Sequence, residues 1–172
     1  MVIDKKFKGL VKEDYRYVFN GNIEITENLE IDLDMGLFVT GHIKAGGDIE
    51  VGESIKAGES IEAGGSIEAG WHIEAGWHIE AGWSIKAGEP YGIVAGLSIT
   101  CKGTLSFGLK AFAGICSWRE ISEEEKTITC GKLEGGVVEY GILRETGVEE
   151  SDDKTQEAMR LLKEKGYKIV RQ

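Results

Sequence analysis

Three histidines occupy the same place in a repeated sequence pattern, each immediately before an isoleucine: His42, His72 and His78. An imidazole at such a position could ligate a metal ion or act as a general base. The repeat described below, however, puts His72 and His78 on adjacent faces of a prism and His42 in an earlier turn. We therefore expect no metal site and no catalytic histidine. We interpret the position as an outward one that accepts His in place of Ser or Asp.

The cysteines offer thiol chemistry, but their number and spacing favour free thiols. Cys101, Cys116 and Cys130 are odd in number and include no close pair, which is typical of reduced thiols in a cytosolic protein. Cys101 falls at an inward position of the repeat, so we expect it in the core. The sequence also has no Gly-rich phosphate loop and no Cys-x-x-Cys pair, and we expect no cofactor.

Charge and hydropathy restrict the classes of partner. The formal net charge is −10, which argues against direct binding of nucleic acid along the chain but allows an acidic surface that competes with nucleic acid for a basic partner. The first 20 residues lack the apolar run of a signal peptide, and no stretch reaches transmembrane length. We therefore expect a cytoplasmic protein without membrane contact.

A six-residue repeat must position all of these side chains. One apolar residue recurs in it at Ile25, Ile31, Leu37, Ile43, Ile49, Ile55, Ile61, Ile67, Ile73, Ile79 and Ile85. A second recurs two positions later at Leu33, Val39, Ala45, Val51, Ala57, Ala63, Ala69, Ala75, Ala81 and Ala87. The frame shifts by two residues at 89–92 and resumes at Ile93, Ile99 and Leu105.

This period indicates a parallel β-solenoid, so the fold is mainly β. A period of six fits no helix, whereas each unit alternates outward and inward as a strand does, and a glycine then bends the chain. Units this short bury their inner faces only by stacking. Residues 18 apart carry opposite charges in the pairs Lys44–Glu62, Lys56–Glu74 and Glu68–Lys86, which favours three units per coil. Residues 21–117 then form about five coils.

The regions outside the repeat are interpreted as caps. An open stack exposes core and unpaired backbone at both ends, so we expect residues 1–20 to form an N-terminal cap. Residues 118–150 are predicted to form a β-hairpin cap with its turn at Gly135-Gly136. Residues 151–172 are predicted to form a helix with an apolar stripe of Ala158, Leu161 and Leu162, followed by a short strand. We expect no long loop to project from the coils.

Two sets of outward residues are candidates for binding a partner protein. Trp71, Trp77 and Trp83 follow a glycine in consecutive units, and we expect them at corners, partly exposed. They are either a partner or self-association surface, since exposed Trp is favoured at interfaces, or corner packing in a recently duplicated segment. A belt that faces three ways cannot lie in one interface. The second set is a row of acidic residues, Glu50, Glu62, Glu68, Glu74 and Glu80, which either binds a basic surface or provides solubility.

The segment GNIEI…GHIKAGGDIEVGESIKAG, with LSITCKGTLSFGLKAFAGICSWREISEEEKTITCGKLEGGVVEYGIL, resembles uncharacterised hexapeptide-repeat proteins of Gram-positive bacteria and their phages. That group brings no catalytic residues to carry over. The repeat alone also resembles bactofilins, bacterial cytoskeletal solenoids that polymerise end to end, although the C-terminal unit of this chain could block one end. In acyltransferases built from six-residue repeats, the repeat resembles apolar-Gly-x-x-small-x. In this chain Glu or Lys, not Gly, follows the Ile. We therefore expect no enzyme.

Together these observations lead to two expectations about function. The first is a non-catalytic acidic interaction protein, a homo-oligomer that binds another protein. If a phage encodes it, as the resemblance implies, it would inhibit a host defence or nucleic-acid-processing protein by covering a basic surface. The alternative is a self-assembling structural scaffold of the bactofilin kind.

Overall fold

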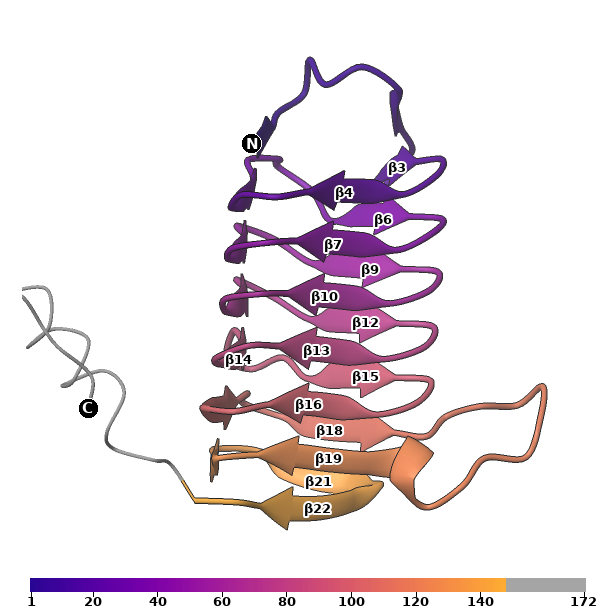
Figure 1. Cartoon of the computed structure of the whole chain (residues 1–172). Helices are drawn as coiled ribbons and strands as arrows, with labels where there is room; N and C mark the ends of the chain where they lie inside the picture. The colour runs from indigo at the N-terminus through magenta and orange to yellow at the C-terminus, as the bar shows by residue number, and fades with distance from the viewer. Residues whose placement is uncertain (148–172) are drawn as a thin grey trace, which may run out of the picture.

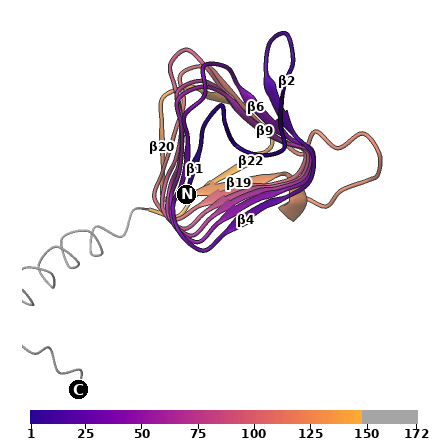
Figure 2. The same ribbon diagram turned by 90° about the horizontal axis from the view of Figure 1, so that it is seen from above.

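The computed structural model describes residues 1–147, which fold into a triangular prism of short stacked strands (Figure 1, Figure 2). Three sheets form its sides, and their strands run parallel apart from the antiparallel pair β2–β3. Sheet A contains β1 (Val2–Ile3), β5 (Leu29–Ile31), β8 (Ile49–Val51), β11 (Ile67–Ala69), β14 (Ile85–Ala87), β17 (Thr104–Ser106) and β20 (Lys132–Glu134). Sheet B contains β2 (Leu10–Lys12), β3 (Tyr17–Phe19), β6 (Leu37–Val39), β9 (Ile55–Ala57), β12 (Ile73–Ala75), β15 (Ile93–Ala95), β18 (Lys110–Ala113) and β21 (Val137–Tyr140). Sheet C contains β4 (Ile23–Ile25), β7 (Ile43–Ala45), β10 (Ile61–Ala63), β13 (Ile79–Ala81), β16 (Ile99–Cys101), β19 (Thr127–Cys130) and β22 (Ile142–Glu145).

The strand register confirms the predicted parallel β-solenoid with three units per coil. Ile61 pairs with Ile43 on one side and with Ile79 on the other, so neighbouring strands are 18 residues apart. Ile61 and Ala63 point into the prism and are buried, while Glu62 between them faces outward. One column of Ile and one of Ala or Val therefore fill the middle of the prism, and larger residues such as Ile31 and Phe107 fill the second column toward its two ends.

The predicted phase of the repeat is wrong at its start. Ile23, not Ile25, pairs with Ile43, and Leu29, not Ile31, pairs with Ile49. A second frame shift therefore occurs in residues 32–36, between β5 and β6, and Leu33 is buried within that longer link. The error arose because both inward positions are large and apolar in this segment, so either frame matches the pattern. The links 32–36 and 88–92 both join sheet A to sheet B.

The predicted C-terminal β-hairpin is also wrong. β20 pairs with β17 and β21 pairs with β18, both in parallel, so residues 127–140 add a coil to the five expected over 21–117. Gly135 and Gly136, with φ of 73° and 57°, form a sharp corner between two sheets rather than a hairpin turn. Left-handed glycines suit either geometry, which explains the error.

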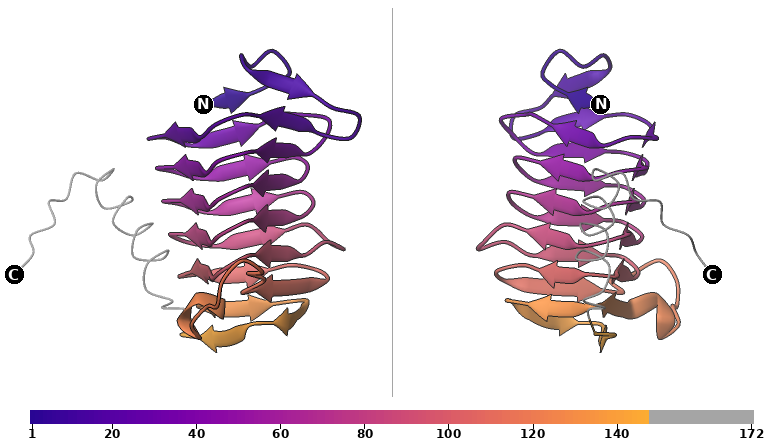
Figure 3. Two further views of the ribbon diagram at one scale, coloured as in Figure 1. Left: turned by 90° about the vertical axis from the view of Figure 1, so that its right-hand side faces the viewer. Right: turned by 60° about the vertical axis from the view of Figure 1, so that its left-hand side comes forward.

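A long connection does project from the coils, contrary to expectation. Residues 114–126 leave the prism between β18 and β19 and return through a short 3-10 helix, η1 (Glu124–Lys126) (Figure 1, Figure 3). Arg119 holds this loop together through two hydrogen bonds to the Glu125 carboxylate. The loop therefore adds surface at one corner of the prism, where sheets B and C meet.

The first 20 residues lie at the N-terminal end of the stack (Figure 1). β1 continues sheet A beyond β5, and β2 folds back against β3 in an antiparallel pair. The Phe7 ring packs against Phe19, with ring centroids 5.7 Å apart. The predicted helix and strand of residues 151–172 lie outside the described residues. No helix within residues 1–147 is long and apolar enough to cross a membrane.

Candidate interaction surface

The three predicted tryptophans occupy three different corners of one coil, as expected. Trp71 lies between sheets A and B, Trp77 between sheets B and C, and Trp83 between sheets C and A. Their exposed fractions are 44 %, 46 % and 41 %. The Trp71 ring stacks on Tyr91, with centroids 5.3 Å apart and 12° between the ring planes. Trp71 and Trp77 flank sheet B, whereas Trp83 lies on the opposite edge of the prism.

The candidate glutamates do not form one surface. Glu50 and Glu68 lie on sheet A, Glu74 on sheet B, and Glu62 and Glu80 on sheet C. A single partner cannot contact all five, because the three sheets face in different directions (Figure 2).

The predicted charge pairs between coils are confirmed, and they neutralise three of these glutamates. Lys44 Nζ lies 2.7 Å from Glu62 Oε2, Lys56 Nζ lies 2.6 Å from Glu74 Oε1, and Lys86 Nζ lies 2.5 Å from Glu68 Oε1. The hydrogen bond from Lys44, with a smaller contribution from His78, lowers the pKa of Glu62.

Sheet A carries a row of acidic side chains with only one lysine beside it. Glu30, Glu50 and Glu68 face outward from adjacent strands and lie directly opposite one another. Lys86 follows at one end of this row and contacts only Glu68. Like charges held opposite one another across neighbouring strands repel, so this row costs stability that the fold must supply elsewhere.

His72 lies at the corner between sheets A and B, whereas His42 and His78 both lie at the corner between sheets B and C, two coils apart. Each contacts a residue of another coil. His42 Nε2 lies 2.8 Å from Glu24 Oε1, and His72 Nδ1 lies 2.9 Å from Ser54 Oγ. Within residues 1–147, no three His, Cys, Asp or Glu side chains come close enough to hold a metal ion.

His78 has hydrogen-bond partners of the same types as the histidine of a catalytic triad. His78 Nδ1 is 3.1 Å from Ser60 Oγ, and His78 Nε2 is 3.2 Å from Glu62 Oε1. A serine–histidine–carboxylate set can activate a hydroxyl for attack. However, Ser60 is only 3 % exposed, so a substrate cannot reach its oxygen. The three side chains therefore act as a hydrogen-bonded link between coils.

Cys101 lies in the core, as its inward position in the repeat predicts. Cys101 and Cys130 are buried on successive strands of sheet C, and Cys116 is partly exposed in the projecting loop. Burial raises the pKa of the Cys101 thiol to about 12 and that of the Cys130 thiol to about 11.

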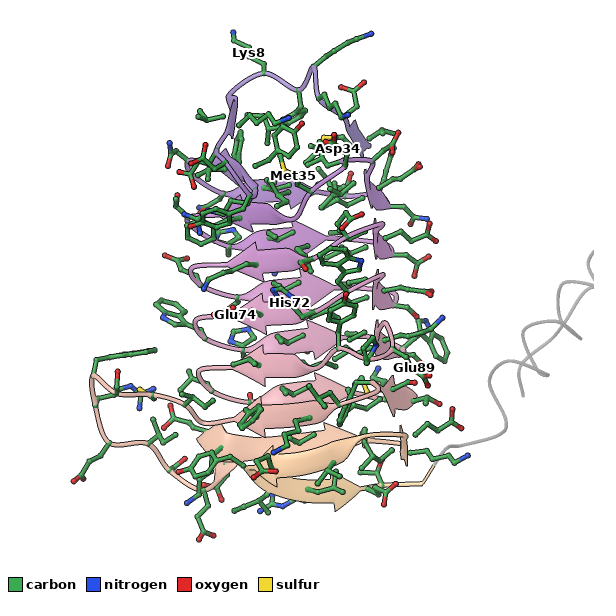
Figure 4. All side chains as sticks on the ribbon, turned by 180° about the vertical axis from the view of Figure 1, so that it is seen from behind. Lys8, Asp34, Met35, His72, Glu74 and Glu89 are labelled. Atoms are coloured by element: carbon green, nitrogen blue, oxygen red, sulfur yellow. The ribbon has the colours of Figure 1, made fainter. Side chains whose placement is uncertain are left out.

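An apolar surface on sheet B was not predicted. The outward position is charged or polar on sheet A from β5 to β20 and on sheet C from β4 to β19. On sheet B it holds Phe38, then the charged Lys56 and Glu74, and then Val94, Phe112 and Tyr140. Val94 pairs with Phe112, and Phe112 with Tyr140, so three apolar side chains follow one another along the prism. Figure 4 views the molecule from this side, with Glu74 on the face of the sheet and Glu89 at its corner with sheet A.

Both corners that border sheet B extend this surface. Backbone hydrogen bonds from Leu109 to Tyr91 and from Val137 to Leu109 align an apolar column at the corner with sheet A, which begins at Trp71. At the corner with sheet C, Leu97 donates to the Trp77 carbonyl and Ile115 follows in the next coil. The ring of Trp118, from the projecting loop, packs over Gly96. We call the two corner columns and the central column the apolar panel; it comprises Trp71, Tyr91, Leu109, Val137, Val94, Phe112, Tyr140, Trp77, Leu97, Ile115 and Trp118.

The apolar panel is large for an exposed surface. Seven of its side chains are between 44 % and 59 % exposed: Trp71, Trp77, Leu109, Ile115, Trp118, Val137 and Tyr140. Large side chains have on the order of 150–250 Å² of surface each, so these seven expose roughly 700 Å². Monomeric proteins rarely expose a patch above about 300–600 Å² without a functional reason.

Opposite charges neutralise one another at the edges of the apolar panel. Lys56 contacts Glu74, and Lys110 Nζ lies 3.0 Å from Glu139 Oε2. Sheet B is thus close to neutral where sheet A is acidic.

A search of known proteins adds no relative to these observations: no protein-family model, no curated protein and no solved structure matches the chain.

Proposed function

We propose that this protein is a non-catalytic interaction module whose acidic sheet A binds a basic surface of another protein. The observation that carries this proposal is the row Glu30, Glu50 and Glu68. Neighbouring strands are about 4.8 Å apart, so the Glu50 carboxylate is repelled by Glu30 on one side and by Glu68 on the other, although Lys86 offsets the charge of Glu68. A basic partner would relieve that repulsion and would also be steered toward the row during association.

The comparison with the other sheets supports this reading of the row. On sheet C a lysine interrupts the outward glutamates, in the order Glu24, Lys44, Glu62 and Glu80, and on sheet B Lys56 lies beside Glu74. A lysine at this position is therefore compatible with the fold. Its absence between Glu30 and Glu68 is not a requirement of the solenoid.

The class of partner follows from the regularity of the charges. Each strand of DNA carries one phosphate per about 3.4 Å of helix axis, a linear density of the same order as that of the carboxylates. A protein groove that holds nucleic acid is a basic surface with which such a row is complementary. If the chain is encoded by a phage, a host defence or nucleic-acid-processing protein is the target we propose, and covering its groove would inhibit it.

Two charge-matched variants test the proposal. Glu30→Gln with Glu50→Gln removes two charges from sheet A, and Glu24→Gln with Glu80→Gln removes two from sheet C. Each variant is used to capture proteins from a bacterial lysate, and binding of the purified captured protein is then measured with rising salt and with duplex DNA as competitor. We expect the sheet A variant alone to lose binding and DNA to compete. Equal binding by both variants would overturn the proposal.

A self-assembling scaffold is the second candidate function. The observation that favours it is the C-terminal end of the stack, where β20, β21 and β22 each pair with only one strand among the described residues. Light scattering over a wide range of concentration separates the two candidates. Growth into large species would favour the scaffold, and a fixed small mass would favour the interaction module.

A further inference from the structure

We infer that the apolar panel is the contact surface of a homodimer, in which the sheet B of a second copy packs face to face against it. The inference concerns a surface that the proposed function does not use, because the acidic row lies on sheet A. It depends on the distribution of apolar and charged side chains around the prism.

The three sheets share one repeat and so provide an internal comparison. The outward position of that repeat needs no apolar residue, because Glu, Lys, Ser or Thr occupies it on sheets A and C. Sheet B nevertheless holds Val94, Phe112 and Tyr140 there, and apolar columns lie at both of its borders. The roughly 700 Å² they expose approaches the ~800 Å² that each partner buries in a stable interface of standard size.

Charge favours sheet B as the surface through which two copies would meet. Two chains of net charge −10 repel one another, and contact through sheet A would bring their glutamates together. The apolar panel is bordered by the ion pairs Lys56–Glu74 and Lys110–Glu139, which cancel. Packing through sheet B therefore joins two acidic molecules at the surface where their repulsion is least.

The order of the strands makes sheet B complementary to itself. A two-fold axis that runs along β15 turns the second prism antiparallel and puts Val94 of one copy opposite Val94 of the other. It then stacks β12 over β18 and β9 over β21 of the opposite copy. The register puts Glu74 of each copy opposite Phe112, two residues from Lys110 on the same strand, and Lys56 opposite Tyr140, next to Glu139. In an interface with two-fold symmetry, a residue that contacts a different residue of the partner copy makes that contact twice, once in each direction.

A pair of matched variants tests the dimer. Val94→Asp brings two carboxylates together at the two-fold axis, whereas Thr100→Asp puts the same charge at the equivalent position of the next strand on sheet C. We expect the wild type and Thr100→Asp to sediment as dimers, and Val94→Asp to raise the dissociation constant at least ~100-fold. Far-UV circular dichroism establishes that all three proteins are folded.

A cross-link identifies the surface directly. In a Cys116→Ser background, Val94→Cys should form a disulfide-linked dimer under mild oxidation, and Thr100→Cys should not. A wild type that stays monomeric at high concentration, or a Val94→Asp protein as dimeric as Thr100→Asp, would overturn the inference. The Glu30→Gln, Glu50→Gln variant should remain dimeric, so failure of the proposed partner site and failure of the dimer can be told apart.

Discussion

Two glycines at matching positions of the repeat should respond in opposite directions to replacement by alanine. Gly76 and Gly52 each follow the second inward residue of a unit, and neither has a positive φ, so both backbones accept alanine. A Cβ added to Gly76 would overlap the carbonyl oxygen of Gly58 in the preceding coil, whereas a Cβ added to Gly52 meets no atom within 4 Å. At this corner the preceding coil has the longer link 32–36 in place of a regular turn, and no atom of that link lies within 4 Å of the added Cβ.

The expected magnitudes follow from these surroundings. Gly52→Ala should stabilise the protein by about 0.4–1 kcal/mol, because alanine lowers the entropy of the unfolded chain. Gly76→Ala gains the same amount but forces two rigid backbone segments apart, at a cost of about 1–3 kcal/mol for overpacking and about 1 kcal/mol for weakening the bond from Gly76 to the Ala57 carbonyl. The net destabilisation is about 1–3 kcal/mol, which lowers Tm by roughly 3–10 °C in a chain of this size.

Urea unfolding followed by far-UV circular dichroism measures both changes as shifts of the transition midpoint at an unchanged m value. The wild type and the two variants are compared at one protein concentration, so that self-association does not enter the difference. Equal shifts for the two variants, or a larger loss of stability for Gly52→Ala, would refute the reasoning that the Gly58 carbonyl of the preceding coil causes the difference.

The remaining predictions concern groups outside the repeat corners. Cys101 and Cys130 should resist a disulfide reagent at pH 8 in the native protein while Cys116 reacts, because burial raises the pKa of the first two thiols to about 12 and about 11; rapid reaction of all three without denaturant would contradict this. Hydrogen bonds, the largest from Arg119, lower the pKa of Glu125 to about 2, so their contribution to loop stability is present above about pH 4.5 and is lost as the pH falls through about 2. Carboxyl NMR titration should show that value, and Arg119→Met should move it upward; an unchanged value in the variant would show that Arg119 is not the cause.

The solenoid could be predicted from the sequence because its signals are local and periodic. Alternation within each unit defines a strand, and the 18-residue spacing of Lys44 and Glu62 defines the coil. The phase at Ile25 and Ile31 could not be predicted, because neighbouring large apolar residues satisfy both frames. The last coil was missed because its units lose the six-residue spacing and because Gly135-Gly136 is typical of a hairpin.

The candidate surface was harder to predict than the fold. The exposure of Trp71, Trp77 and Trp83 follows from their position after a corner glycine, and the structure agrees. The apolar panel was missed because Val94 and Phe112 are neighbours only across coils. Comparing outward residues at intervals of 18–20 would have revealed that one sheet differs from the other two.

The pairing of strands almost entirely between adjacent coils has a mechanical consequence. Through most of the prism each strand residue is in register with residues 18 or 20 positions away, so strand pairing joins only adjacent coils. Under tension applied at its two ends, such a molecule should unwind from an end, one coil at a time. An 18-residue coil measures about 60 Å when fully extended, so the chain should lengthen in nearly equal steps of that order. The force at which each step occurs would then measure the stability of a single coil.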